Sequence, residues 1–169
     1  MDRPKVGVGV LVVRDGRVLL GRRKGAHGAG QWSVPGGHME AGEEFDETCE
    51  REVEEETGMR VSFSSVAPID FTNDVFAEED LHYVTLFFFA EAAGEPRNME
   101  PDRLDGEWQW FGLDHLPDPL FPPLKQLLAR EKVRTLVEAH DEMPRWIPLA
   151  FWVPLGLLIA ILLAEFFTA

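Results

Sequence analysis

The stretch GGHMEAGEEFDETCEREVEEETGM, residues 36–59, decides the fold of this chain. It combines about ten carboxylic side chains with an apolar stripe and a closing glycine, Gly58. These features predict a helix from about Glu43 to Thr57, because glycine commonly follows the last helical residue. Each like-charged pair one turn apart destabilises a helix by roughly 0.2–0.5 kcal/mol. Such crowding therefore requires either complete solvation or a positive group held beside the helix.

At about 100° per residue, the acids of this helix separate into two groups. One group shares a face that solvation explains: Glu43, Glu47, Glu50 and Glu54. The apolar stripe is expected to face the core: Phe45, Cys49 and Val53. The second group, Glu52, Glu55 and Glu56, falls at the margin of that stripe. A hard divalent cation would relieve the repulsion among these three carboxylates, although simple exposure of every acid explains the spacing equally well.

The overall charge excludes one class of partner. The 169-residue chain has a formal net charge of -14, and its basic residues cluster only modestly, at residues 22–24. Because such a chain repels phosphate backbones, no nucleic acid polymer is expected as a partner. Cys49 is the sole cysteine, so no intrachain disulfide can form. The N-terminal residues lack the long apolar run of a signal peptide.

The rest of the chain predicts interleaved strands and helices. Two Val- and Leu-rich runs flank Asp15 and Gly16, a pair typical of a tight hairpin turn. A glycine-rich loop over residues 24–37 leads into the acidic helix. Further strands are expected over residues 59–71, 81–92 and 107–116. Residues 120–140 are expected to form one helix that starts at the prolines, and the irregular order indicates an α/β protein with a mixed sheet and helices on both faces.

The C-terminal region has a different composition. Residues 146–164 carry no charge, and roughly 20 apolar residues can span a bilayer as a helix. We therefore expect residues 1–138 to form the globular domain, 139–145 a linker and 146–167 a C-terminal transmembrane helix. The alternative is a helix buried in the core or packed into a dimer, and two prolines weaken the membrane interpretation slightly. An anchor of this kind would hold the globular part at the cytoplasmic face of a membrane.

The acidic stretch also resembles a known family motif. From Gly37 it reads Gly, five residues, Glu43, seven residues, Arg51-Glu52-Val53, one residue, Glu55-Glu56, one residue, Gly58-Met59. This is similar at every fixed position to the Nudix box, G-x5-E-x7-R-E-U-x-E-E-x-G-U, in which U is a bulky aliphatic residue. The resemblance implies a Nudix-type α/β/α sandwich with a mixed β-sheet. It also implies hydrolysis, dependent on Mg²⁺ or Mn²⁺, of a nucleoside diphosphate linked to another group.

The likeness extends beyond the box, over about residues 5–130. The segments VLLGRRKG, GAGQW, PGGHMEAGE, HYVT and EWQW resemble the branch of the family that includes the human thiopurine-nucleotide diphosphatase. That resemblance implies a nucleoside triphosphate diphosphatase, which forms the monophosphate and pyrophosphate and could clear modified nucleotides. Pro122 and Pro123 depart from the branch, which has an aromatic-Gly pair there. Because proline has no N–H to donate, the base preference of the branch does not carry over.

The resemblance assigns roles to the residues of the box. It implies that Glu52, Glu55 and Glu56, together with the Gly37 carbonyl, hold the metal. Glu52 and Glu55 are the candidate catalytic carboxylates, and Glu52 would orient or deprotonate the attacking water, whose pKa a metal lowers strongly. Glu43 and Arg51 are expected to brace the loop against the helix through a charge-assisted hydrogen bond. A buried ion pair with no such purpose is the alternative for the last two.

Substrate contacts are expected outside the box. Arg23 and Lys24 match a basic stretch that touches phosphates in the family, with an ordinary solvated turn as the alternative. Tyr83 and Thr85 match positions that line the base pocket, and residues two apart on a strand share a face; a routine core strand is the alternative. His38, after the two glycines, is a further phosphate-contact candidate. His27, in the glycine-rich loop, could contact phosphate too, but a lone loop histidine is more often simply exposed, so it is not assigned to the site.

Two other functions remain open on the sequence. One is hydrolysis of ADP-ribose, dinucleotides or nucleotide sugars by the same carboxylates. The other, from a different class, is a membrane-tethered sensor that binds a nucleotide without turnover, although the presence of all the catalytic carboxylates gives this reading no direct support. A homodimer is an expectation from the family resemblance alone.

Overall fold

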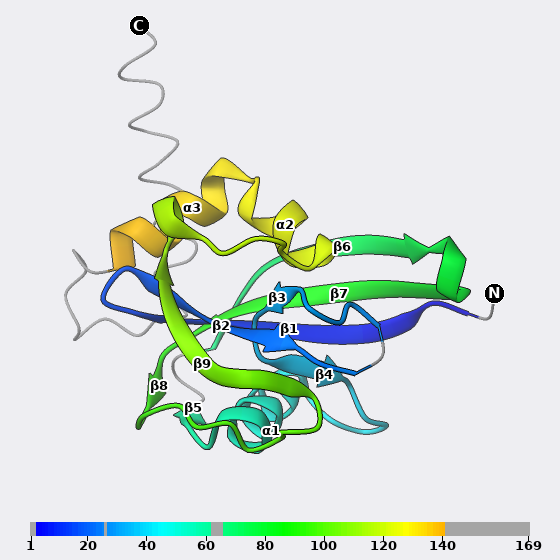
Figure 1. Ribbon diagram of the computed structural model, residues 1–169, viewed down its shortest axis with the longest axis horizontal. Coiled ribbons are helices and arrows are strands. Elements are labelled where there is room, and N and C mark those ends of the chain that lie inside the picture. The colour runs from blue at the N-terminus through cyan, green and yellow to red at the C-terminus, as the bar shows by residue number, and fades with distance from the viewer. Residues whose placement is uncertain (1–2, 26, 62–65, 141–169) are drawn as a thin grey trace, which may run out of the picture.

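The computed structural model describes residues 3–25, 27–61 and 66–140, and the structural statements below concern those residues. A mixed sheet forms the middle layer, with α1 (Phe45–Thr57) on one face and α2 (Pro122–Leu128) and α3 (Glu131–Ala139) on the other (Figure 1). This confirms the predicted α/β architecture. The predicted linker beyond residue 140 and the predicted transmembrane segment, residues 146–167, lie outside the described residues.

The centre of the sheet is β1 (Lys5–Arg14), which contacts strands from distant parts of the chain. It runs parallel to β7 (Leu81–Ala90), whose other neighbour is the antiparallel edge strand β6 (Ala67–Phe76). Its far end turns directly into β2 (Arg17–Arg23), and Asp15 and Gly16 both have positive φ in that turn. The predicted hairpin is therefore confirmed. Because β1 also pairs with β4 (Gly36–His38), the glycine turn before the acidic helix is fixed to the sheet.

Shorter elements complete the fold. Two further strands pair antiparallel with β2: β9 (Leu104–Gly112) lies on the side away from β1, and the short β3 (Trp32–Ser33) lies on the opposite side of β2 from β9. A separate small ladder joins β5 (Arg60–Val61) to β8 (Ala92–Ala93). Two single 3₁₀ turns, η2 (Ala77–Glu79) and η3 (Leu113–His115), close the connections after β6 and β9.

The acidic helix α1 begins two residues later than the spacing predicts and ends where predicted. Its first turn is closed by a capping box, in which the Glu44 backbone N–H donates to Glu47 Oε2 at 2.9 Å. At the other end, Gly58 adopts φ 69° and donates its N–H to the carbonyl of Glu54 at 2.9 Å. Of the predicted core stripe, Cys49 and Val53 are fully buried, whereas Phe45 is 44% exposed and contacts only the edge of the core through Phe88.

The predicted single helix over residues 120–140 is wrong, because the structure has two helices there. Between α2 and α3, Arg130 leaves the helical conformation with φ -85° and ψ 119°. Its guanidinium bonds to Asp70 at 2.5 Å and donates to the Phe71 carbonyl at 3.0 Å. These contacts with β6 hold the chain in an extended conformation at the junction, which interrupts the helix.

Alternation along the strands divides the core into two apolar clusters, one on each face of the sheet. Leu11 and Val13 of β1 pack with α2 and α3, whereas Val10 and Val12 pack with Cys49 and Val53 of α1. None of the helices in the described part of the chain is both long enough and apolar enough to cross a membrane.

Candidate functional site

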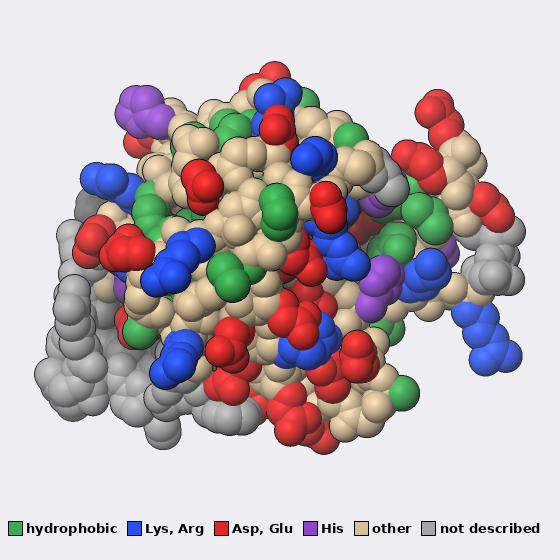
Figure 2. Space-filling view, turned by 60° about the horizontal axis from the view of Figure 1, so that its bottom comes forward, with side chains coloured by type: hydrophobic (Ala, Val, Ile, Leu, Met, Phe, Trp, Pro, Cys, Tyr) green, Lys and Arg blue, Asp and Glu red, His purple; other side chains and the backbone are tan. Residues whose placement is uncertain are grey.

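A cavity of about 420 Å³ opens between the glycine turn, the sheet and the start of α2. We call it the central cavity. Residues from most of the chain line it, including Arg23, Gly37, Glu56, Thr85 and Phe121. Figure 2, with the α1 side of the molecule turned forward, shows acidic side chains gathered on this face with basic side chains among them. Two carboxylates, Glu56 and Glu100, line the cavity itself.

The two glycines of the turn bring the backbone against the carboxylates of α1. The Gly36 N–H donates to Glu56 Oε2 at 3.1 Å. A Cβ on Gly37 would collide with the carboxylate of Glu52, and a Cβ on Gly36, whose φ is 153°, would collide with the Val8 carbonyl. Only glycine allows this approach at both positions. Two acids one helical turn apart, Glu52 and Glu56, thus flank the backbone of residues 36–37.

Arg51 joins the acidic helix to the loop before it. Its guanidinium donates to Glu43 Oε1 at 2.6 Å, to Glu52 Oε1 at 2.8 Å and to the His38 carbonyl at 3.1 Å. The predicted contact between Glu43 and Arg51 is present, and its hydrogen bonds, with one from the Glu40 backbone, lower the pKa of Glu43 to about 2. Glu43 therefore lies in the loop as a partner of Arg51 and not on a solvated helix face.

Burial governs the two carboxylates beside the turn. Burial raises the pKa of Glu56 to about 8, and the nearby charges of Glu52 and Glu100 raise it as well. The hydrogen bond from the Gly36 N–H acts in the opposite direction and lowers this pKa. Burial also raises the pKa of Glu52, and Arg51 opposes that rise. Glu55, the third predicted metal ligand, is not buried like the other two. Its side chain is 56% exposed, and its carboxylate lies 3.3 Å from the Arg51 guanidinium. Across the described ranges, no three His, Cys, Asp or Glu side chains are arranged as a ready metal cluster.

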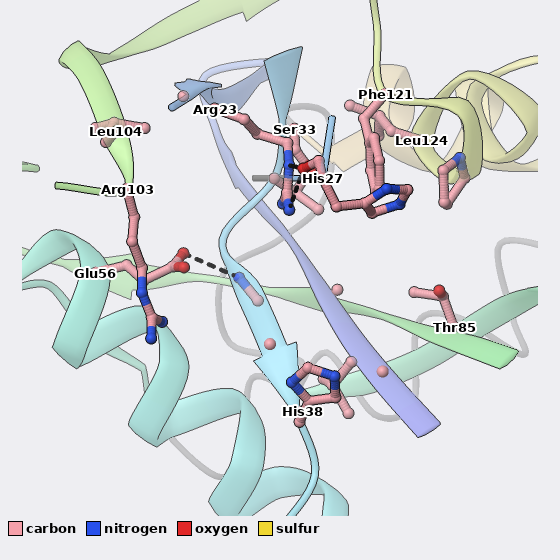
Figure 3. A pocket seen from close by; sticks show the side chains of 18 of the residues that line it. Arg23, His27, Ser33, His38, Glu56, Thr85, Arg103, Leu104, Phe121 and Leu124 are labelled. Carbon is pink, nitrogen blue, oxygen red and sulfur yellow. Dashed lines mark hydrogen bonds between the residues drawn. The ribbon is translucent and has the colours of Figure 1, made fainter. Parts of the chain in front are cut away.

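The predicted phosphate contacts lie at the opposite wall. Arg23 comes from the end of β2 and donates to the His27 carbonyl at 3.2 and 3.1 Å, with its guanidinium 4.5 Å from the Phe121 ring centre. Burial lowers its pKa, while Glu56 and Tyr83 raise it. Figure 3 shows Arg23 pointing into the cavity with Glu56 on one side of it. Lys24 lines the cavity as well and donates to the Pro101 carbonyl at 2.9 Å.

The predicted base-contact residues lie together at the open end of β1 and β7. Tyr83 and Thr85 both line the cavity, and the Tyr83 hydroxyl is 3.0 Å from Nε2 of His38. Burial lowers the pKa of His38, as do Lys5 and Arg103. The structure therefore joins three of the predicted substrate contacts into one wall. Glu52 and Glu55 do not line the cavity itself, and Glu52 reaches it only through Gly37.

Several lining residues escaped the sequence analysis. The prediction that His27 is exposed is wrong, because its side chain is only 17% exposed and contacts Phe76 and Phe121. Arg103 brings a further positive charge near Glu56 (Figure 3). No local pattern marks these positions, since the hairpin of β6 and β7 and the loop before α2 bring them together only in the fold. Pro123, noted as a departure, does line the cavity.

These features define a class of site: an α/β/α sandwich with a pocket for a small molecule that carries both anionic and aromatic groups. Residues 3–130 match the family model described as NUDIX domain, and the chain belongs to the Nudix family.

Three similar proteins show how close the likeness is. A crystal structure of the MutT NUDIX hydrolase from Burkholderia pseudomallei is 37% identical, with a TM-score of 0.72, covering 77% of this chain and 99% of that one. The oxidized purine nucleoside triphosphate hydrolase of Danio rerio is 37% identical over 109 residues, which are 64% of this chain and 66% of the fish protein. A third relative, the ADP-ribose pyrophosphatase of Methanocaldococcus jannaschii, is 29% identical over 118 residues.

Proposed function

We propose that this protein is a nucleoside triphosphate diphosphatase, which hydrolyses a nucleoside or deoxynucleoside triphosphate to the monophosphate and pyrophosphate. One observation carries the proposal: a single cavity has the Glu56 carboxylate at the Gly36–Gly37 turn, the half-buried Arg23 across from it, and aromatic rings beyond. A triphosphate needs cationic contacts, and a base needs apolar walls. The cavity volume of about 420 Å³ lies within the usual range for ligand pockets.

The phosphate chain is assigned to the side of the cavity that holds Arg23 and Lys24. Arg23 is fixed by two hydrogen bonds to the His27 carbonyl. Its side chain therefore needs no further ordering for the remaining N–H groups to bind phosphate. A guanidinium presents a planar fork of donors that fits phosphate oxygens. The protein is strongly acidic overall, and these local cations therefore orient the substrate within the site.

The carboxylates of α1 fit a divalent cation, Mg²⁺ or Mn²⁺. Glu52, Glu55 and Glu56 with the Gly37 carbonyl would hold it, because hard cations take oxygen ligands of these types. The fit rests on Glu52 and Glu56, whose burial beside each other raises both pKa values and creates a need for positive charge. When bound, the metal would offset charge on the phosphate oxygens and lower the pKa of a coordinated water.

Glu52 is our candidate for orienting and deprotonating the attacking water. Its carboxylate packs against Gly37 and is held by Arg51 at 2.8 Å. Arg51 in turn is fixed by Glu43, so the pair positions Glu52 and does not itself touch the substrate. Glu55, also held by Arg51 but more exposed, is the second candidate catalytic carboxylate.

The names of the relatives support this choice of reaction. The fish relative, 37% identical to this chain over 109 residues, is named for hydrolysis of oxidized purine nucleoside triphosphates. A relative named as an ADP-ribose pyrophosphatase is 29% identical to this chain. Hydrolysis of ADP-ribose is therefore the alternative reaction to test. The match covers 66% of the length of the fish protein. The activity of this chain is therefore a proposal and is not taken over from that relative.

Product analysis tests the proposal. The purified protein is incubated with Mg²⁺ and a panel of nucleoside triphosphates, ADP-ribose, dinucleotides and nucleotide sugars. We expect a nucleoside monophosphate and pyrophosphate from the triphosphates. Release of two monophosphates or a sugar phosphate from the other compounds, with triphosphates left intact, would instead favour the second reading. Tight nucleotide binding with no product over hours would favour a sensor.

We also propose that residues 146–167 anchor the protein in a membrane, on the basis of the uncharged run at 146–164. Fractionation of cells that express the full chain, or a version that ends at Arg145, tests this. We expect only the full chain in the membrane fraction. Equal solubility of both versions without detergent would rule the anchor out.

A further inference from the structure

Arg103 lies at the rim of the central cavity, beside the carboxylates of α1. It comes from the loop between β8 and β9, and both Arg103 and Glu100 of that loop line the cavity. The Arg103 guanidinium lies 3.4 Å from Glu100 Oε2. Figure 3 shows Arg103 next to Glu56, at the opposite end of the cavity from Phe121. The cavity thus has a second arginine, on the far side of the carboxylates from the aromatic rings.

The backbone of this loop is fixed to the walls of the cavity. The Met99 N–H donates to the Glu56 carbonyl at 3.2 Å, and the Lys24 N–H donates to the Arg103 carbonyl at 2.7 Å. Lys24 Nζ also donates to the Pro101 carbonyl at 2.9 Å. Arg103 is therefore attached at a defined place between the end of α1 and the end of β2.

The Arg103 side chain is available to a ligand. It is 75% exposed, and its hydrogen bond to Glu100, at 3.4 Å, is long. An exposed ion pair of this kind contributes little to stability, so an anionic ligand can replace it readily. Lys24 differs, because its Nζ is engaged by the Pro101 carbonyl. The guanidinium of Arg103 therefore has donors to offer to an anion that enters the cavity.

The order of charges along the cavity decides which anion Arg103 meets. Arg23 lies against Phe121, with 4.5 Å between its guanidinium and the ring centre, and its charge interacts with that of Glu56. Glu56 interacts in turn with Glu100, the partner of Arg103. From the rings outward, the order is therefore Arg23, then the carboxylates, then Arg103. A nucleotide whose base contacts the rings extends its phosphates in this direction.

We propose that Arg103 binds the terminal phosphate of a nucleoside triphosphate and makes the site select triphosphates over diphosphates. The inference rests on the proposed nucleoside triphosphate diphosphatase activity and deepens it, because it assigns the residue that distinguishes the length of the phosphate chain. A diphosphate ends beside Arg23 and the carboxylates and lacks this contact. A third phosphate would be repelled by Glu56 and Glu100 without a cation beyond them, and a guanidinium binds two phosphate oxygens at once.

Matched nucleotides test the inference. Values of kcat and KM are measured with Mg²⁺ for the four common deoxynucleoside triphosphates, which give monophosphate and pyrophosphate, and for their diphosphates, which give monophosphate and phosphate. We expect the wild type to favour the triphosphate in kcat/KM by about tenfold or more, because only the longer chain makes the charge-assisted contact. In Arg103→Gln that ratio should fall to near one, mainly through a higher KM for the triphosphate. Arg103→Lys, which keeps the charge without the planar fork, should restore part of the ratio.

Arg97→Gln is the matched control, because Arg97 is an exposed arginine of the same loop that does not line the cavity. It should keep the wild-type ratio. An unchanged ratio in Arg103→Gln would overturn the assignment even if both activities fell, because Arg103 would then only hold Glu100 in place. A wild type without a preference for triphosphates would overturn it too.

Binding without turnover separates a failure of this inference from a failure of the proposed function. Affinities of the full chain for α,β-methylene analogues of the same triphosphates and diphosphates are measured by calorimetry with Mg²⁺. The wild type should bind the triphosphate analogue about tenfold more tightly, and Arg103→Gln should bind both equally. If this pattern holds but no pyrophosphate is ever released, the proposed function fails while the role of Arg103 stands. Equal binding of the two analogues by an active wild type would overturn the inference alone, and binding of neither would overturn both.

Discussion

At the scale of single residues, the site depends on which carboxylates of α1 face the glycine turn. Glu52 is buried against Gly37, whereas Glu54, two residues on, faces solvent. Both residues are glutamates on the same helix and differ only in direction. The helical wheel predicted this difference from the sequence, and the structure confirms where each side chain lies.

Substitution of these two glutamates separates chemistry from charge. Glu52→Gln should lower kcat by about 100-fold or more, because a preorganised charge at the reacting centre is lost. Glu54→Gln removes the same charge from the helix and should retain nearly full activity. Steady-state kinetics with pyrophosphate detection measures both, and circular dichroism checks the fold. Equal activity of the two variants would show that the assigned face is wrong.

The two glycines of the turn make a second contrast at this scale. In Gly36→Ala the new Cβ would meet the Val8 carbonyl, and backbone cannot move aside, so we expect a large loss of thermal stability. In Gly37→Ala the Cβ would meet the Glu52 carboxylate, which can shift. That variant should melt close to the wild type but lose most of its activity.

Melting curves and kinetics of the two alanine variants check this contrast together. A stable Gly36→Ala would show that the strand pairing at the turn tolerates displacement. A fully active Gly37→Ala would show that the position of the Glu52 carboxylate is unimportant. Either result would contradict the account of the turn.

At the scale of elements, the junction between α2 and α3 holds one wall of the cavity to the sheet. Asp70 on the edge strand β6 bonds to both Arg130 and Lys132 at 2.5 Å. Burial would raise the pKa of Asp70, but the hydrogen bonds from Lys132 and Arg130 outweigh it and lower the pKa to about 2. A second link from β6 reaches α2, where Gln126 donates to the buried Asp74 at 2.7 Å. Together the links fix α2 and α3 to the sheet, and Pro123 of α2 and the preceding Phe121 line the cavity.

The Asp70 contacts predict a definite dependence of stability on pH. A carboxylate whose folded pKa is lowered stabilises the protein above its usual pKa near 4, and that contribution is lost as pH falls from about 4 to 2. Asp70→Asn should therefore lower the free energy of unfolding by about 1 kcal/mol at pH 7, after allowance for solvent screening.

Urea unfolding at pH 7 and at pH 3 tests this dependence. The difference between Asp70→Asn and the wild type should shrink at the lower pH, because Asp70 is then partly protonated in the unfolded chain. The same difference at both values would mean that the ion pairs do not account for the stability. Asp114→Asn, at an exposed partner of Arg134, is a suitable control and should change little.

Sequence alone predicted the elements whose signals are local. The hairpin at Asp15 and Gly16, and the end of α1 at Gly58, each follow from one or two residues with special backbone conformation. The break at Arg130 could not be predicted in this way, because its cause is Asp70, sixty residues earlier in the chain. The burial of His27 likewise depends on Phe76 and Phe121. Contacts between segments that are distant in the chain produce no periodic pattern in the sequence, so they could not be predicted from it.

At the scale of the whole molecule, one face of the sheet supplies the acids and the other supplies the aromatic wall. The glycine turn and α1 lie on one side of β1, and α2 lies on the other, so the cavity forms where the two layers meet at the ends of β1 and β7 (Figure 1). Trp108 of β9 fixes the end of α1 by donating to the Glu56 carbonyl at 3.0 Å. The fold thus holds an anionic group and a cationic group on opposite walls of one pocket.

The central claim is that the carboxylates of α1 bind a divalent cation together with the nucleotide. Calorimetric titration of Mn²⁺ into the full chain, with a non-hydrolysable nucleoside triphosphate present and a protein-free titration subtracted, measures this directly. We predict saturable uptake that weakens at least about tenfold in Glu56→Gln and is unchanged in Glu54→Gln. Wild-type protein that takes up no Mn²⁺ beyond the protein-free titration, or a Glu56→Gln variant that binds as tightly as the wild type, would contradict the account.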